Sequence, residues 1–201
     1  MSDTAIAIDP KVVKDLRDRT NVGMMDCKNA LVEAKGDLEE AEKILRKKLN
    51  LSAAKKASRE AKEGVISSYI HLGGKVGVLV EINCETDFVA KNEGFREFVK
   101  EITLQIAAAS PLYVNREEVP ANLVAAEQEV AAAQIKDKPA AVVEKIVAGK
   151  IDKFYSTICL MDQVSIKDPN MTIREIVNAK IGAIGENIVI RRFVRFALGE
   201  G

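Results

Sequence analysis

The spacing of apolar residues predicts helices over the first fifty positions of the chain. Apolar side chains recur there at intervals of three and four, which places them on one face of a helix. Asp9 precedes Pro10, a capping residue before a proline at the first helical position. Gly36 ends a second helix, and Asp37, with a glutamate three residues later, opens a third. The pattern predicts a bundle of three short helices over 1–51.

Two breaks in this pattern separate the first elements. Asn21 and Gly23 tolerate a positive φ, so we expect a turn between the first two helices. Residues 52–63 are rich in alanine and charge but lack an apolar face, which predicts a helical linker. The four basic side chains of this linker are interpreted as a solvated face rather than a phosphate-binding strip.

Beyond the linker the hydrophobic period changes from helical to two. Alternation over 64–72 and 76–82, with a glycine pair at 73–74, predicts a β-hairpin. Asn92 is then a candidate cap for a helix whose apolar residues over 95–106 follow helical spacing.

The carboxyl-terminal half completes the fold prediction. Its predicted elements are helices over 123–134 and 140–155, a helix opened by the capping pair Thr172 and Glu175 and ended by Gly182 and Gly185, and a strand over 187–196. The order of helices, hairpin, helices and strand predicts an α+β fold. We expect an N-terminal domain over 1–51, a linker over 52–63, and a core over 64–201 whose antiparallel sheet is covered by helices.

Composition narrows the class of function. Thirty Lys and Arg balance 30 Asp and Glu among 201 residues, so the zero net charge disfavours nucleic-acid binding as the main role. No apolar run reaches the roughly 18 residues of a membrane span, and the start of the chain does not resemble a signal peptide. Three cysteines without a CxxC pair, and one histidine, predict reduced thiols and no metal site. We expect a cytoplasmic protein that does not bind membranes.

Catalytic chemistry has few candidates in this sequence. No phosphate-binding loop is present, so direct binding of a nucleotide or another cofactor is not expected. Cys84 and His71 flank the same hairpin, but no acid is evident to orient the histidine, so a cysteine hydrolase is a weak alternative. Glu85 and Asp87 are two residues apart, and a carboxylate pair without a pocket is weak evidence for acid–base chemistry.

The segment Thr86-Asp87-Phe88 stands out because an aromatic residue follows an acid in an expected surface connection. Two interpretations of Phe88 are open. The ring folds back onto the local core, as most phenylalanines do. Alternatively, it is an aromatic anchor that fills a pocket of a partner.

Three segments resemble the signatures of the bacterial elongation factor Ts family. They are 16–31 (LRDRTNVGMMDCKNAL), 83–92 (NCETDFVAKN) and a carboxyl-terminal segment that matches over 185–192 (GENIVIRR) and 195–201 (RFALGEG). Their order along nearly the whole chain makes a chance match very improbable. The resemblance implies a small ubiquitin-associated-like three-helix domain, a linker and an α+β core, in agreement with the elements predicted above.

The resemblance also implies a function. The family promotes GDP release from elongation factor Tu during translation elongation, as a guanine nucleotide exchange factor without covalent catalysis. By resemblance, Phe88 inserts with Asp87 near the Mg²⁺ and phosphate site of the GTPase, flanked by Thr86 and Val89. The alternative is a protein that binds the GTPase without exchanging its nucleotide.

Further partner contacts and the assembly are implied in the same way. Arg17, Val22, Met24 and Met25 match positions of the family's N-terminal domain that face the GTPase. Family members often carry glycine where this chain has Asn21, which also tolerates the left-handed conformation. Short members with a single core work as homodimers, so we expect a homodimer that forms a two-plus-two complex with elongation factor Tu.

Overall fold

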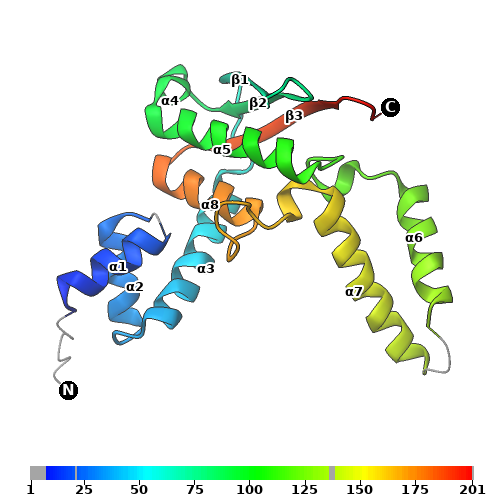
Figure 1. Cartoon of the computed structure of the whole chain (residues 1–201). Coiled ribbons are helices and arrows are strands. Elements are labelled where there is room, and N and C mark those ends of the chain that lie inside the picture. The colour runs from blue at the N-terminus through cyan, green and yellow to red at the C-terminus, as the bar shows by residue number, and fades with distance from the viewer. Residues whose placement is uncertain (1–7, 21, 136–138, 201) are drawn as a thin grey trace. The chain divides into compact units, whose positions relative to one another are not determined.

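The computed structural model describes residues 8–20, 22–135 and 139–200. These residues form eight α-helices, two short 3₁₀ helices and one sheet (Figure 1). The helices are α1 (Pro10–Thr20), α2 (Met24–Glu33), α3 (Leu38–Lys56), α4 (Asp87–Lys91), α5 (Glu93–Ala109), η1 (Arg116–Glu118), α6 (Ala121–Ala133), α7 (Ala140–Ile158), η2 (Leu160–Asp162) and α8 (Ile173–Ile184). The strands are β1 (Glu63–Ile70), β2 (Val76–Cys84) and β3 (Ile188–Ala197).

The chain divides into two compact units, each discontinuous in sequence. The first unit comprises Met1–Gly64, Asn83–Phe95 and Glu175–Val189. The second unit comprises Val65–Ile82, Arg96–Arg174 and Ile190–Gly201. The turn that carries Asp87 and Phe88 therefore belongs to the same unit as the three N-terminal helices.

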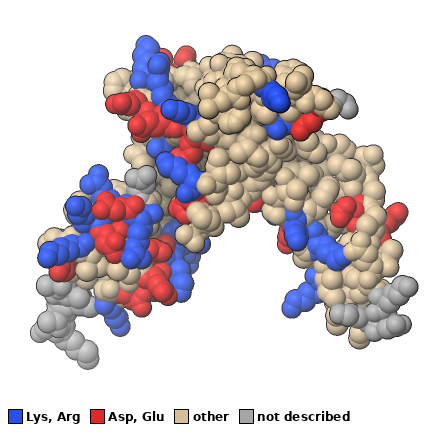
Figure 2. All heavy atoms as spheres, in the orientation of Figure 1, with Lys and Arg blue, Asp and Glu red and all other residues tan. Residues whose placement is uncertain are grey.

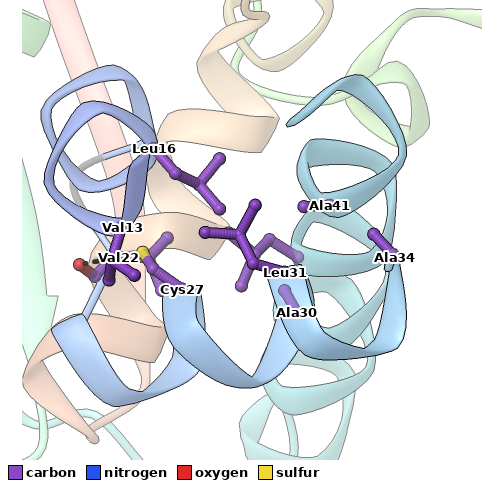
Figure 3. Close-up of a cluster of buried hydrophobic side chains, with 9 residues drawn as sticks. Val13, Leu16, Val22, Cys27, Ala30, Leu31, Ala34 and Ala41 are labelled. Carbon is purple, nitrogen blue, oxygen red and sulfur yellow. Dashed lines mark hydrogen bonds between the residues drawn. The ribbon is translucent and has the colours of Figure 1, made fainter. Parts of the chain in front are cut away.

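The three N-terminal helices pack around a small apolar core. Figure 3 shows Leu16 of α1 and Leu31 of α2 pointing into the space between the helices, and both side chains are fully buried. Small residues such as Ala30 and Ala41 let the helices approach each other closely. Asp9 caps α1, because its Oδ1 accepts a hydrogen bond from the backbone N of Lys11 at 2.8 Å. The prediction of three helices is confirmed, but the third is not short: α3 has 19 residues and continues past residue 51 to Lys56.

Glycine and aspartate set the boundary between α2 and α3. Gly36 has a φ of 89°, and its backbone N donates to the carbonyl of Leu31 at 2.8 Å, which satisfies an end carbonyl of α2. The Asp37 side chain accepts from the backbone N of Glu40 at 2.9 Å. The backbone N of Asp37 donates to Ala34, so the capping is one-sided rather than reciprocal.

Two expectations near this bundle have different outcomes. The helix predicted over 52–63 is too long, since α3 already ends at Lys56 and residues 57–62 are turn and irregular backbone. Polar and charged side chains in this stretch supply no buried apolar face that would extend the helix. The turn expected at Asn21 lies outside the described residues.

The sheet has the order β1-β2-β3 and is antiparallel. The hairpin between β1 and β2 turns where Gly73 and Gly74 have φ values of 87° and 69°, which side chains rarely tolerate. Helix α5 lies along one face of the sheet (Figure 1), and the residues of β2 on that face, Val78, Val80 and Ile82, are buried. The α+β class is therefore confirmed.

Gly182 and Gly185 have separate roles in α8. Gly185 follows the helix with a φ of 87°, and its backbone N donates to Ile181 at 2.9 Å, so it ends the helix as predicted. Gly182 lies inside the helix, and a Cβ atom there would collide with the side chain of Leu49 in α3. The prediction that Gly182 also ends the helix is wrong, because its small size serves the close approach of α3 and α8 instead.

Helices α6 and α7 form an antiparallel hairpin within the second unit (Figure 1), and both helices predicted there are confirmed. The side chain of Arg116 stabilises the base of this hairpin. The Nε atom donates to Asp162 at 3.0 Å, and Nη1 donates to Asp152 at 2.9 Å. The guanidinium also lies 4.7 Å from the ring centre of Tyr155. One side chain thus joins η1, α7 and η2.

Candidate functional site

The turn between β2 and α5 carries the candidate site. Strand β2 ends at Cys84, and Thr86 has an extended backbone with φ −126° and ψ 152°. Its Oγ1 accepts a hydrogen bond from the backbone N of Val89 at 3.3 Å. This cap starts α4, a five-residue helix where the sequence predicted only a connection. The cap of Thr86 was the signal that sequence reasoning did not use.

Helix α4 exposes one pair of residues and buries the next. Phe88 is 78% exposed, and Asp87 is exposed beside it. Val89 and Ala90 are each only 7% exposed and hold the helix against the protein. Of the two interpretations of Phe88, the structure contradicts burial in the local core. An exposed aromatic ring is available to a partner without loss of core packing.

Asp87 forms an ion pair within α4. Lys91 Nζ donates to Asp87 Oδ2 at 2.7 Å, one helical turn away. The hydrogen bond from Lys91, together with its positive charge, lowers the pKa of Asp87, and Asp87 raises the pKa of Lys91 in return. Asp87 therefore presents an ionised carboxylate next to the exposed ring of Phe88.

A carboxylate from a distant part of the chain holds the start of this turn. Glu186, which follows α8, accepts hydrogen bonds from both the backbone N and the hydroxyl of Thr86. Glu85 accepts from the backbone N of Asn187 at 2.6 Å, whereas Asp87 pairs with Lys91. The structure thus gives Glu85 and Asp87 separate partners and forms no acid pair from them. Sequence reasoning missed Glu186 because it lies 100 residues from Thr86.

The N-terminal candidates divide into exposed and buried residues. Met24 and Met25 at the start of α2 are 43% and 65% exposed, and Arg17 is exposed on α1. Val22 is 5% exposed and lies in the bundle core, where its carbonyl accepts from Cys27 Sγ at 3.7 Å (Figure 3). Figure 2 shows Lys, Arg, Asp and Glu interspersed over these helices. The two methionines are therefore apolar contacts available within a charged surface.

Comparison with known proteins decides the family. The family model described as Elongation factor TS matches residues 6–200. The chain belongs to the elongation factor Ts family. It is 59% identical over 196 residues to elongation factor Ts of Anaeromyxobacter sp. (strain K), a match that covers 96% of this chain and 90% of the relative. Elongation factor Ts of Caldanaerobacter subterraneus subsp. tengcongensis is 55% identical over 196 residues, which cover 96% of this chain and 98% of the relative.

A third relative, elongation factor Ts of Geobacter sulfurreducens, is 56% identical over 191 residues, which cover 94% of this chain and 88% of the relative. The resemblance of the three segments to the elongation factor Ts signatures is therefore confirmed. The matches extend over the N-terminal helices, the turn at Asp87 and Phe88, and β3 alike.

The thiol of Cys84 is poorly suited to nucleophilic chemistry. Its side chain is fully buried, and burial, reinforced by the charge of Glu186, raises the pKa of Cys84 to about 11. Its Sγ donates to the carbonyl of Thr86 at 3.2 Å. The Nδ1 atom of His71 is hydrogen-bonded to the hydroxyl of Tyr69 at 2.8 Å. A protonated, buried thiol argues against the cysteine hydrolase.

Metal ligands are not clustered in the part of the chain that the structure describes. Across 8–20, 22–135 and 139–200, no three His, Cys, Asp or Glu side chains gather where they could hold a metal ion. Over the same ranges, no helix combines the length and the apolar character that crossing a membrane requires.

Proposed function

We propose that this member of the elongation factor Ts family is a nucleotide exchange factor for elongation factor Tu, and that it speeds GDP release during translation elongation. Family membership over residues 6–200 supports both the partner and the activity. The observation that carries the role of the turn is the exposure of Phe88, of which 78% is open to solvent. Phe88 inserts with Asp87 near the bound Mg²⁺ and phosphates, and no covalent step is involved.

The energetic basis of exchange is a difference in affinity. A factor that binds nucleotide-free GTPase more tightly than GDP-bound GTPase weakens GDP binding by the same ratio. Equal affinity for the two states shifts nothing, however tight the binding is. Insertion of Phe88 supplies this difference, because the ring occupies space that opens only when the nucleotide site is distorted.

Phe88 and Asp87 contribute different kinds of interaction. Transfer of an exposed phenylalanine ring from water into a pocket is worth roughly 1.5–3 kcal/mol. Asp87 brings an ionised carboxylate, its pKa lowered by Lys91, towards a site that holds a cation and anionic phosphates. A carboxylate there competes with the phosphates for Mg²⁺ and for hydrogen-bond donors. Thr86 and Val89 support both side chains from the backbone of α4.

The N-terminal helices serve as the docking domain in this proposal. Residues 1–51 bind the GTPase and are joined through 52–63 to the core over 64–201. Arg17, Met24 and Met25 supply exposed contacts, and their exposure supports this role. Val22 supports the docking surface from beneath, since its side chain is buried.

We further propose a homodimer that forms a two-plus-two complex with elongation factor Tu. The support is an exposed apolar surface of the second unit, named here the outer sheet face. It comprises Ile66 and Ile70 of β1, Leu79 of β2, and Val194 and Phe196 of β3. Their exposed fractions run from 41% to 71%, and a hollow of 280 Å³ lies among part of them. Exposed apolar patches of this kind mark protein interfaces.

A nucleotide-release measurement tests the exchange function. Elongation factor Tu is loaded with a fluorescent GDP analogue, chased with unlabelled GDP, and mixed with substoichiometric amounts of this protein. We expect faster release by the unaltered protein and a rate about 30-fold lower for Phe88→Ala, the equivalent of a binding hot spot of about 2 kcal/mol. Leu112→Ala is the control, because Leu112 is also an exposed apolar residue, at 64%, but belongs to the other compact unit.

The other outcomes discriminate between the hypotheses. Unchanged release in spite of measurable binding would favour the non-exchanging binding protein. Equal rates for Phe88→Ala and the unaltered protein would retain exchange but remove the insertion of Phe88 from the mechanism.

A further inference from the structure

We propose that Glu186 is a positioning residue for exchange: it fixes the backbone from which Asp87 and Phe88 project. The inference rests on the proposed role of Phe88. Its structural basis is the carboxylate of Glu186, which accepts three hydrogen bonds at once. Glu186 Oε2 accepts from the backbone N of Glu85 and of Thr86, each at 3.1 Å, and Oε1 accepts from Thr86 Oγ1 at 2.7 Å.

The hydroxyl of Thr86 links Glu186 to α4. A hydroxyl has one hydrogen to donate and two lone pairs with which to accept. Thr86 gives its hydrogen to Glu186, and the lone pairs then face the backbone N of Val89, which donates to Oγ1 at 3.3 Å. Glu186 therefore orients the backbone at Glu85 and Thr86, and it also orients the Thr86 hydroxyl that caps α4.

A second hydrogen bond joins the same two segments in the opposite direction. Glu85 Oε1 accepts from the backbone N of Asn187 at 2.6 Å, while Glu186 accepts from the backbone N of Glu85. Asn187 is 3% exposed, and its Nδ2 donates to the carbonyl of Arg59 at 2.8 Å. Arg59 in turn lies 3.5 Å from Glu85. Bonds run in both directions, so neither segment shifts without breaking several of them.

The position of Phe88 depends on these contacts of Glu186 because α4 is short and the ring is not held by the core. A helix of five residues closes few backbone hydrogen bonds and is unstable by itself. The ring of Phe88 is exposed, so core packing does not orient it. Buried Val89 and Ala90 anchor the far side of α4, and Glu186 anchors its beginning. A fixed backbone lowers the ordering that insertion into a partner would otherwise require.

Substitution of Glu186 tests this role in the release assay described above. We expect Glu186→Ala to slow release about tenfold while the chain stays folded, as checked by circular dichroism. We expect Glu186→Gln to stay within about threefold of the unaltered rate, because an amide oxygen accepts from both backbone groups and an amide nitrogen donates to the Thr86 hydroxyl. Glu129→Ala is the control, since Glu129 is an exposed glutamate on α6.

The decisive comparison adds Glu186→Ala to the variant Asp87→Ala/Phe88→Ala. If Glu186 acts through Asp87 and Phe88, the triple variant releases GDP at the rate of Asp87→Ala/Phe88→Ala. The proposal would be overturned if the losses in rate from the separate substitutions multiplied in the combined variant. It would also be overturned if Glu186→Gln were as slow as Glu186→Ala, or if Glu186→Ala released GDP at the unaltered rate.

Hydrogen exchange separates this proposal from the proposed function. We expect Glu186→Ala to speed exchange at the amides of Glu85, Thr86 and Val89 at least tenfold, and exchange in α6 to stay the same. Unchanged protection at these amides overturns the positioning role even if Phe88 proves essential. Loss of protection together with a fully active Phe88→Ala would instead show that the turn is positioned as described but that Phe88 is not the inserted group.

Discussion

Phe88 remains exposed because its neighbours are buried. Successive residues of a helix are 100° apart around its axis, so Val89 and Ala90 point inward where Asp87 and Phe88 point outward. The ring contributes little to folding, and most of its apolar surface is available for burial against a partner. In the proposed function, binding and folding are therefore carried by different side chains of the same short helix.

The cysteines lead to a prediction at the residue scale. Burial raises the pKa of Cys84 and of Cys159 to about 11, and raises the pKa of Cys27 as well. At pH 8 we expect a disulfide reagent to react with Cys84 and Cys159 of the native protein at least about 100-fold more slowly than with the same thiols of the unfolded chain, because little thiolate is present. Equally fast reaction in the absence and presence of urea would contradict this expectation.

The same shifts predict how stability depends on pH. The unfolded thiols ionise near pH 9 and the native ones near pH 11, so the native state favours the protonated form. Their contribution to the free energy of unfolding is complete below about pH 9 and is lost as the pH rises to about 11. Urea unfolding at pH 8 and pH 10.5 measures this loss. A variant that replaces Cys84 and Cys159 by alanine should lose less stability over the interval.

At the scale of the element, the α6–α7 hairpin depends on a few charged groups at its base. The side chain of Asp162 is 13% exposed. Its Oδ1 accepts a hydrogen bond from Arg116 Nε at 3.0 Å and forms an ion pair with Arg116 Nη2 at 2.9 Å. Its second oxygen lies 3.5 Å from Arg174, an ion pair without hydrogen-bond geometry. The half-buried carboxylate thus relies mainly on one partner.

Arg116→Met should therefore destabilise this base. The methionine keeps much of the length but leaves Asp162 without its hydrogen bond from Nε and its ion pair with Nη2, and we expect a loss of about 1.5–3 kcal/mol in the free energy of unfolding. Urea unfolding measures the change. Lys43→Met is the matched control, because the Lys43–Glu40 ion pair is exposed on both sides and contributes about 0.5 kcal/mol or less. Equal losses in the two variants would rule out Arg116 as the main support of the hairpin.

At the scale of the whole molecule, the sheet has two apolar faces of different exposure. One face is covered by α5 and contains the buried side chains of β2. The outer sheet face carries apolar side chains in all three strands and remains exposed in the single chain. Exposed apolar area is a liability for a monomer, and its burial against a second copy would favour association.

The proposed homodimer can be tested by sedimentation. We expect the unaltered protein to sediment as a dimer at micromolar concentration, and Ile70→Glu and Phe196→Glu to shift it towards monomer, since each would bury an unpaired carboxylate. Both residues are about 70% exposed in the single chain, at 68% and 71%, so folding should survive the change. Leu51→Glu is the control, on an exposed residue of α3. A monomeric unaltered protein, or dimeric variants, would refute this interface.

Several elements of the fold were predictable because their causes are local. The start of α1, the end of α2, the start of α3 and the β1–β2 turn follow from Asp9, Gly36, Asp37 and the glycine pair at 73–74, each acting within a few residues. Sequence patterns failed to predict the role of a residue type that suits two different positions in a helix. Gly182 was as plausible a helix end as a packing site, and only Leu49 of α3 distinguishes the two.

The sequence by itself determined most of the elements, the α+β class and the family, because capping, turn formation and hydrophobic period act between near neighbours, and the signature segments are continuous. The tertiary structure alone decided which side chains are exposed. It placed Val22 in the bundle core and Phe88 in solvent. It also brought Glu186 to Thr86 across 100 residues of chain. Burial and long-range hydrogen bonds depend on which segments meet in space, and near-neighbour patterns do not encode that information.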